Sequence, residues 1–160
     1  MAACAARAPE FRWVAESNLH LTIRFLGSVD AMTAHQLGER LIGLPIEPFR
    51  LQLGELGMFQ RGRLVRVVWA GLATGADAAR GLAGLVEDEC ARSGLEPEKR
   101  LFQAHLTLAR ARAREGAPKP ELPELPRLEA WTADELVLYQ SHLGRGGAVY
   151  EPLVRVALGG

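Results

Sequence analysis

The 160-residue chain is predicted to adopt a mixed α+β fold built from two related halves. Three observations support this prediction: a globular composition, an alternation of strand-like and helix-like segments, and one strand-like pattern that occurs twice. Hydrophobic residues make up 48% of the chain and charged residues 24%, a balance typical of one globular domain with a proper core.

Composition excludes several classes of protein. No apolar stretch of the chain approaches the length of a membrane span, and the opening MAACAARAPE lacks the basic start and apolar run of a signal peptide. We therefore expect a cytoplasmic protein. Cys4 and Cys90 form no CxxC pair, so neither a disulfide framework nor a zinc site is indicated, and both are expected to be reduced thiols.

The charges are balanced in sum but unequal in kind. Lys+Arg and Asp+Glu both total 19, so no general attraction to nucleic acid or membrane is expected. Arginine accounts for 17 of the basic residues, and its planar guanidinium suits bidentate phosphate contacts. Arginine abundance can also reflect codon bias, so it carries no weight by itself. Two groups stand out: Arg61, Arg63 and Arg66, and Arg110, Arg112 and Arg114.

The stretch NLHLTIRFLG, residues 18–27, alternates apolar and polar side chains. The apolar positions are Leu19, Leu21, Ile23 and Phe25, and the polar ones are His20, Thr22 and Arg24. A period of two predicts a strand with one apolar face. The polar face either meets water or holds a ligand.

Two segments show helical periodicity. Residues 33–44 have Thr33 and Gln36 in the positions of a capping box, and residues 77–94 end at a glycine that precedes a proline. The apolar stripes are Leu37, Leu41 and Leu44 in the first helix, and Ala79, Leu82, Val86 and Cys90 in the second.

The remaining segments read as strands and connectors. Residues 49–56 and 63–71 alternate as strands, with residues 57–63 expected to form the loop between them. The proline-rich stretch 115–126 is expected to be an extended connector. The tail, residues 127–158, predicts three strands with a turn at Gly144 to Gly147.

The stretch FQAHLTLAR, residues 102–110, repeats the earlier pattern. His105 and Thr107 stand two apart, as His20 and Thr22 do, and the two histidines are separated by 85 residues (105 − 20). Each copy is accompanied by further strand and helix signals. The repeat indicates two related halves and favours a functional role for the histidines over an ordinary polar face.

Two His-x-Thr-x strands separated by about half a small chain resemble the two-histidine (2H) phosphoesterase superfamily. The flanking words RWVAESNLHLTIRFLG, HLTLAR and LYQSHLGRGGAVYEPL resemble its bacterial RNA 2′,3′-cyclic phosphodiesterase branch, formerly called 2′-5′ RNA ligase. The resemblance runs from about Arg12 to the C-terminus. One such motif is common by chance, whereas two in register with these words are specific.

The resemblance implies a single bilobal domain over residues 1–160. Each lobe would be an antiparallel sheet backed by helices, with the two lobes related by a pseudo-twofold axis and the active-site cleft between them. Family members open with a strand and a helix before the segment that matches RWVAESNLH, and these are expected to be missing or shortened here. One lobe is then expected to lack a strand and to carry an exposed edge.

The chemistry explains why such a site needs two copies of the motif. Opening a cyclic phosphate with water requires a base and an acid on opposite sides of phosphorus. Imidazole can serve as either near neutral pH, and the hydroxyls of Thr22 and Thr107 can donate hydrogen bonds to the non-bridging oxygens. The resemblance makes His20 the acid and His105 the base, although the near symmetry of the motifs leaves the order open. No metal or cofactor is required.

Other side chains are weaker candidates. The resemblance implies a phosphate contact for Arg110, which strict alternation places opposite His105, so it reaches the site only if the strand ends, bulges or twists. Arg24 shares the parity of His20 but could equally be a salt-bridge partner or a solvated strand end. Phe59, Phe102 and Tyr150 are candidates for stacking on a base, although most aromatic side chains belong to cores. His35 and His142 are expected to be surface residues.

Three functions from different classes follow. The favoured one is metal-independent hydrolysis of RNA 2′,3′-cyclic phosphate ends to 2′-phosphates, with possible weak 2′-5′ RNA ligation by the same site. The second is hydrolysis of a small cyclic-phosphate nucleotide or metabolite. The third is a non-catalytic RNA-binding module, against which the two intact motifs argue. The expected partners are RNA 3′ ends or nucleoside 2′,3′-cyclic phosphates, and the expected state is a monomer.

Overall fold

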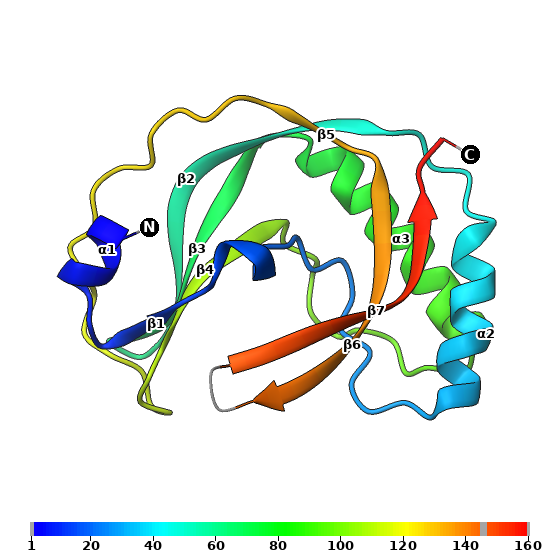
Figure 1. The fold of residues 1–160 in the computed structure, drawn as a ribbon, viewed down its shortest axis with the longest axis horizontal. Coiled ribbons are helices and arrows are strands. Elements are labelled where there is room, and N and C mark those ends of the chain that lie inside the picture. Colours follow the sequence, from blue (N-terminus) through cyan, green and yellow to red (C-terminus); the bar gives the residue numbers. More distant parts are fainter. Residues whose placement is uncertain (1, 145–146, 160) are drawn as a thin grey trace. The chain divides into compact units, whose positions relative to one another are not determined.

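The computed structural model describes residues 2–144 and 147–159 and divides into two compact units (Figure 1). The first unit comprises Met1–Thr22, Gln52–Thr74 and Ala104–Ala130, and the second comprises Ile23–Leu51, Gly75–Gln103 and Trp131–Gly160. The fold is mixed α+β with antiparallel sheets and few helices, which confirms the predicted class. The predicted cleft between two lobes stays a prediction.

The first unit is built on an antiparallel sheet. Its strands lie in the order β1-β4-β3-β2. Its elements are the helix α1 (Ala2–Arg7), β1 (Phe11–Trp13), the short 3-10 helix η1 (Glu16–Asn18), the greater part of β2 (Phe49–Arg61), β3 (Leu64–Thr74) and β4 (His105–Ala111). The residues before Trp13, where the sequence predicts no element, thus form a short helix and a strand that pairs with β4.

One face of this sheet is apolar. Phe11 is 1% exposed and Val68 and Ala109 are fully buried, and Trp13, Leu56 and Met58 pack against them. The strand register explains this face, because Trp13 lies opposite Ala109, Ala109 opposite Val68, and Val68 opposite Met58. Burial of a side chain such as Phe11 contributes about 1.5–3 kcal/mol. The alternate residues of the same strands therefore point to the other face.

The second unit packs two helices against a hairpin (Figure 1). The helices are α2 (Ala31–Ile42) and α3 (Ala76–Arg92), and the hairpin strands are β6 (Glu135–Gly144) and β7 (Gly147–Ala157). A short strand, β5 (Trp131–Ala133), pairs with the first three residues of β2. The shared core consists of Leu37, Leu41, Leu82, Val86, Cys90, Leu138 and Val156. The predicted stripe of α3 and the three strands of the tail are thus confirmed. In the stripe of α2, Leu37 and Leu41 are confirmed, whereas Leu44 lies beyond the end of the helix at Ile42 and packs against the core from the following loop. The predicted turn residues 145–146 lie outside the described residues.

Burial affects the one cysteine of this core. Cys90 is fully buried among apolar side chains of α3 and its neighbours. Removal of solvent raises the pKa of its thiol, since burial disfavours the thiolate. Cys90 is therefore a packing residue.

The predicted capping box of the first helix is wrong. The helix begins two residues earlier, and Asp30 caps it by accepting hydrogen bonds from the backbone N–H and the hydroxyl of Thr33, at 2.9 and 2.8 Å. These bonds hold the pKa of the Asp30 carboxyl below its ordinary value. Thr33 resembles a cap in sequence, but its hydroxyl donates to the residue that precedes the helix.

The loop predicted at residues 57–63 is also wrong. Strand β2 continues to Arg61, and Met58 and Phe59 pair with Val68 and Val67 of β3. The chain reverses at Gly62, whose φ of +61° lies in the left-handed region that favours glycine. Pairing along a long hairpin satisfies backbone groups that a loop would leave to water.

The strand predicted over residues 18–27 does not form. Leu21 makes one isolated antiparallel bridge to Leu106, and no ladder continues from it. The physical reason is that β4 begins at His105, so the residues after Thr22 have no further backbone of β4 beside them. Alternation fails there too, because Phe25 is 69% exposed and Leu26 packs against the core of the second unit.

A further feature concerns the proline-rich connection. The stretch 115–126 has no helix or strand apart from one bridge between Ala117 and Val65, in line with the predicted extended connector.

Among the helices of the described chain, none is long and apolar enough to cross a bilayer.

Candidate active site

Three polar side chains of β4 lie on one face of the first unit's sheet, the face opposite its apolar core. His105 pairs with Gly71, Thr107 with Trp69, and Arg110 with Val67. Directly paired residues point to the same face, and alternate residues of one strand do as well. Because Val67, Trp69 and Gly71 alternate along β3, their three partners share one face.

A β-bulge brings Arg110 to this face. Thr107 and Ala109 oppose the consecutive residues Trp69 and Val68, so Leu108 is an extra residue in β4. A bulge reverses the alternation of the residues that follow it. Strict alternation had placed Arg110 opposite His105, and the bulge meets the condition under which it could reach the site.

The first motif joins the same face through a single bridge. Leu21 lies antiparallel to Leu106, so one step to either side sets Thr22 beside His105 and His20 beside Thr107. Leu21 and Leu106 point to the other face by alternation. All four motif side chains therefore converge, and all four belong to the first unit.

His20 is oriented by the backbone just before it. Its Nδ1 lies 2.8 Å from the carbonyl oxygen of Asn18. A carbonyl oxygen only accepts hydrogen bonds, so Nδ1 carries a proton and donates it. The protonation of the ring can then change only at Nε2, which is the nitrogen suited to exchange a proton with a substrate.

His105 is held by aromatic rings. The Phe59 ring meets it edge to face at a centroid distance of 5.0 Å, and the Trp69 ring lies 5.9 Å away. The Phe59 and Trp69 rings are themselves 5.3 Å apart. Such contacts fix the ring plane of the histidine and are worth about 0.5–1.5 kcal/mol each.

No pattern in the sequence indicates Trp69 as a residue of this site. Its indole lies across Gly57, where an added Cβ would come within 2.1 Å of Trp69 Cζ2, so a glycine is required at this close approach. The residue alternates with Val67 and Gly71, but only the register of the hairpin shows which face it takes. The face that Trp69 takes could be inferred from the sequence only if the register of β2 with β3 were known.

The three aromatic candidates are divided between the two units. Phe59 lies against His105, as described, while Phe102 and Tyr150 belong to the second unit. The Tyr150 ring contacts the Tyr139 ring at a centroid distance of 5.8 Å. Stacking on a base stays a prediction for all three.

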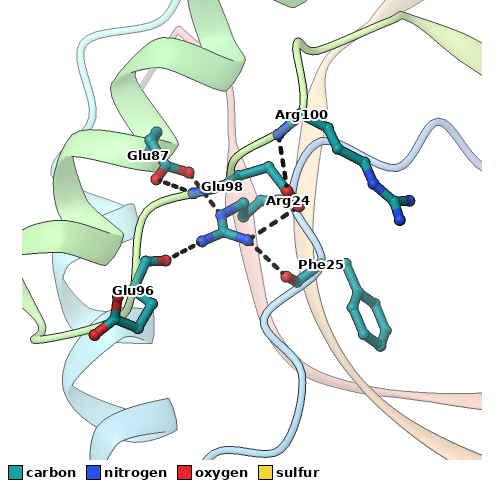
Figure 2. Close-up of polar contacts among 6 residues, drawn as sticks. All are labelled: Arg24, Phe25, Glu87, Glu96, Glu98 and Arg100. Atoms are coloured by element: carbon teal, nitrogen blue, oxygen red, sulfur yellow. Dashed lines mark hydrogen bonds and ion pairs between the residues drawn. The ribbon is translucent and has the colours of Figure 1, made fainter.

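Arg24 is a salt-bridge partner within the second unit (Figure 2). Its Nε lies 2.6 Å from a carboxylate oxygen of Glu87, and a terminal nitrogen lies 3.5 Å from Glu98. The guanidinium also donates to the carbonyl oxygens of Glu96 and Phe25, at 2.6 and 2.8 Å. Its side chain is only 11% exposed. Of the roles left open by the sequence, the structure favours the salt bridge.

The pKa of Glu98 reflects this cluster. The backbone N–H of Arg100 donates to its carboxylate at 3.1 Å, and the Arg24 guanidinium lies nearby. Both interactions favour the charged form, the hydrogen bond more strongly, and hold the pKa of Glu98 below its usual 4.5.

The other two histidines lie on the surface, as expected. His35 pairs with Glu39 one helical turn away at 3.5 Å, and His142 lies 3.4 Å from Glu151 on the neighbouring strand. Within the described residues, no group of three or more His, Cys, Asp or Glu side chains is arranged to hold a metal ion.

Two His-x-Thr segments converging on one face of an antiparallel sheet define the class of two-histidine phosphoesterases. The family model described as "LigT like Phosphoesterase" matches residues 2–69 and 72–150, and the chain belongs to this family. The predictions of an enzyme and of its superfamily are thereby confirmed.

Several relatives are similar to this chain over most of their length. An RNA 2′,3′-cyclic phosphodiesterase of Aeropyrum pernix is 37% identical over 147 residues, covering 89% of this chain and 84% of the relative. The Escherichia coli K12 protein of the same name is 35% identical over 148 residues, covering 92% and 80%. The crystal structure of E. coli LigT complexed with 3′-AMP matches with a TM-score of 0.81 and 31% identity, covering 96% of this chain and 84% of that one.

Proposed function

We propose that this protein hydrolyses RNA 2′,3′-cyclic phosphate ends to 2′-phosphates without a metal ion. The observation that carries the proposal is the convergence of His20, Thr22, His105 and Thr107 on one face of one sheet. The names of the relatives from A. pernix and E. coli support the same substrate class.

In the proposed reaction, water attacks phosphorus while the bond to the 3′-oxygen breaks. His105 accepts the proton of the attacking water, and His20 donates a proton from Nε2 to the leaving 3′-oxygen. The proton on His20 Nδ1 stays on that nitrogen and is donated in a hydrogen bond to the Asn18 carbonyl oxygen, which keeps the ring in one orientation. The product is a 2′-phosphate with a free 3′-hydroxyl.

Three side chains would bind the phosphate. The hydroxyls of Thr22 and Thr107 would donate to the two non-bridging oxygens, where negative charge resides in the transition state. Arg110, brought to this face by the bulge at Leu108, would add a charge-assisted and bidentate contact. If the 5′-hydroxyl of a second RNA took the place of water, the new bond to phosphorus and the broken bond to the 3′-oxygen would leave a 2′-5′ phosphodiester and a free 3′-hydroxyl, which would be weak 2′-5′ RNA ligation by the same site.

The decisive experiment uses excess EDTA. The protein is incubated with a nucleoside 2′,3′-cyclic phosphate or with a short RNA that ends in one, and ring opening is followed by phosphorus NMR. We expect turnover without added metal, faster on the RNA, to a 2′-phosphate. Activity lost in EDTA and restored by a divalent cation would contradict the mechanism, and RNA binding without turnover would indicate a binding module. Turnover that is faster on the mononucleotide would indicate a small cyclic phosphate as the substrate.

A pH profile tests the acid–base pair. If one histidine must be neutral and the other protonated, kcat/KM rises and then falls with pH, and its two limbs report macroscopic constants of the pair. A rate that climbs steadily to high pH would instead indicate attack by hydroxide.

A further inference from the structure

A second arginine lies directly beside Arg110 on the face of the motif residues. Arg12 of β1 pairs with Arg110 of β4 in antiparallel register. The neighbours of Arg12 on β1, Phe11 and Trp13, belong to the apolar core, so Arg12 points to the opposite face. Both arginines are exposed.

This pairing is electrostatically unfavourable in the protein alone. Like charges directly opposite each other in a sheet destabilise it. Among the residues that the structure describes, no carboxylate forms an ion pair with Arg12 or Arg110. By contrast, Arg155 in the β6–β7 hairpin lies 2.7 Å from a carboxylate oxygen of Glu135. The two guanidiniums therefore present an uncompensated positive charge next to the motif residues.

The position of Arg12 follows from the order of residues along β4. Thr22 and His20 lie beside His105 and Thr107, and Arg12 lies beside Arg110 on the same edge of β4. The backbone N–H of Val14 donates to the Leu108 carbonyl, so β1 follows β4 up to the bulge. The pair of Arg12 and Arg110 thus lies next to the four motif side chains along β4, on the other side of the bulge.

We propose that Arg12 binds the phosphodiester that precedes the cyclic phosphate in an RNA chain. The inference rests on the proposed function and names the substrate class more closely. A cyclic phosphate carries one negative charge, for which Arg110 and the motif side chains already supply donors. A second guanidinium one row away matches a second phosphate, which an oligonucleotide has and a mononucleotide lacks. Arg12 is thus a specificity residue for RNA ends.

The test compares two substrates that differ by one nucleotide and hence by one phosphodiester charge. These are a nucleoside 2′,3′-cyclic phosphate and a dinucleotide that ends in the same group. Arg12→Ala should lower the dinucleotide-to-mononucleotide ratio of kcat/KM by about tenfold, the lower end for a hydrogen bond to a charged group. For the dinucleotide, the plot of log kcat/KM against log salt concentration should also become less steep, its slope changing by about 0.7.

A matched control and a modified substrate sharpen the test. Arg80→Ala removes the same charge from an exposed site on α3, where Arg80 pairs with Asp77, and should leave both reactions unchanged. In the modified dinucleotide, an uncharged methylphosphonate replaces the phosphodiester between the nucleosides. The parent protein should turn over this substrate as slowly as Arg12→Ala turns over the natural dinucleotide. Arg12→Ala should lower the rate on the modified dinucleotide no further.

The outcomes separate the inference from the proposed function. If Arg12→Ala leaves the substrate ratio within a factor of two, the contact is absent and the inference is overturned. If the parent protein turns over neither substrate, the proposed function fails. The inference is then decided by calorimetric binding of the 2′-phosphorylated dinucleotide and mononucleotide products to the parent and to Arg12→Ala, where the same tenfold change in ratio is expected.

Discussion

The two His-x-Thr segments are alike in sequence and unlike in structure. His105 begins the seven-residue strand β4, which has β3 on one side and β1 on the other. His20 lies in a segment that touches the same sheet through one bridge, between Leu21 and Leu106. An alternating pattern therefore predicts which side chains share a face only where the chain stays extended and without a bulge, and a strand forms only where a partner backbone continues.

The two histidines are also held by different interactions. Apolar packing positions His105, because the rings of Phe59 and Trp69 contact it. Polar contacts position His20, through the carbonyl of Asn18, and the chain that follows it is anchored by the ion pairs of Arg24. Substitutions near Trp69 therefore act first on His105, and substitutions at Arg24 act first on the chain after His20.

The largest effect is expected when either imidazole is removed. His20→Ala and His105→Ala should each lower kcat by about 10²–10⁴-fold, the usual contribution of a positioned general acid or base. If both groups act on one transition state, the double variant should lose far less than the product of the two factors. Rates are measured on the RNA substrate, with circular dichroism to confirm folding. Full activity in both folded single variants would exclude the two-histidine mechanism.

Arg24→Met tests the anchor that follows the first motif. Removing the guanidinium leaves the carboxylates of Glu87 and Glu98 without their shared partner, and the free energy of unfolding should fall by about 2 kcal/mol. This is less than for a fully buried pair, because those carboxylates are 31% and 40% exposed.

The matched control for Arg24 is Arg155→Met. It breaks the exposed pair with Glu135 and should cost less than about 0.5 kcal/mol. Urea denaturation measures both variants. Equal losses would mean that Arg24 is an ordinary surface charge.

Gly57→Ala disturbs the support of His105 alone. The added methyl group would overlap the Trp69 indole and displace it from the histidine ring, so kcat should fall by about threefold to tenfold, the value of one aromatic contact. In a His105→Ala background the same change should lower kcat no further. Gly84→Ala in α3, where nothing lies within 4 Å of an added Cβ, is the control and should keep full activity.

The smallest effect is a pH dependence of stability at Glu98. Because its pKa is lower in the folded chain than its usual 4.5, the carboxylate stabilises the fold above that pH, and this contribution is lost as the pH falls through the folded value. Glu98→Gln should therefore flatten the loss of stability below about pH 4.5. Thermal unfolding between pH 3 and pH 7 compares the two proteins, and parallel curves would argue against the linkage.

Much of the fold could be predicted because its signals are local. The stripe of Ala79, Leu82, Val86 and Cys90 determined the buried face of α3, since a helix repeats every 3.6 residues whatever surrounds it. The ends of elements were harder to predict. The cap at Asp30 and the length of β2 depend on which backbone groups find a partner, and propensity alone does not contain that information.

By itself, the sequence indicated His20 and His105 as site residues, together with the hydroxyls of Thr22 and Thr107, because a repeated pattern with a period of two marks side chains that share a face. Only the tertiary structure decided that Arg110, Arg12 and Trp69 join them. Arg110 reaches the face through the bulge at Leu108, Trp69 through the register of β2 with β3, and Arg12 through the pairing of β1 with β4. Bulges and registers arise when backbone segments far apart in the chain meet, so no local pattern in the sequence encodes them.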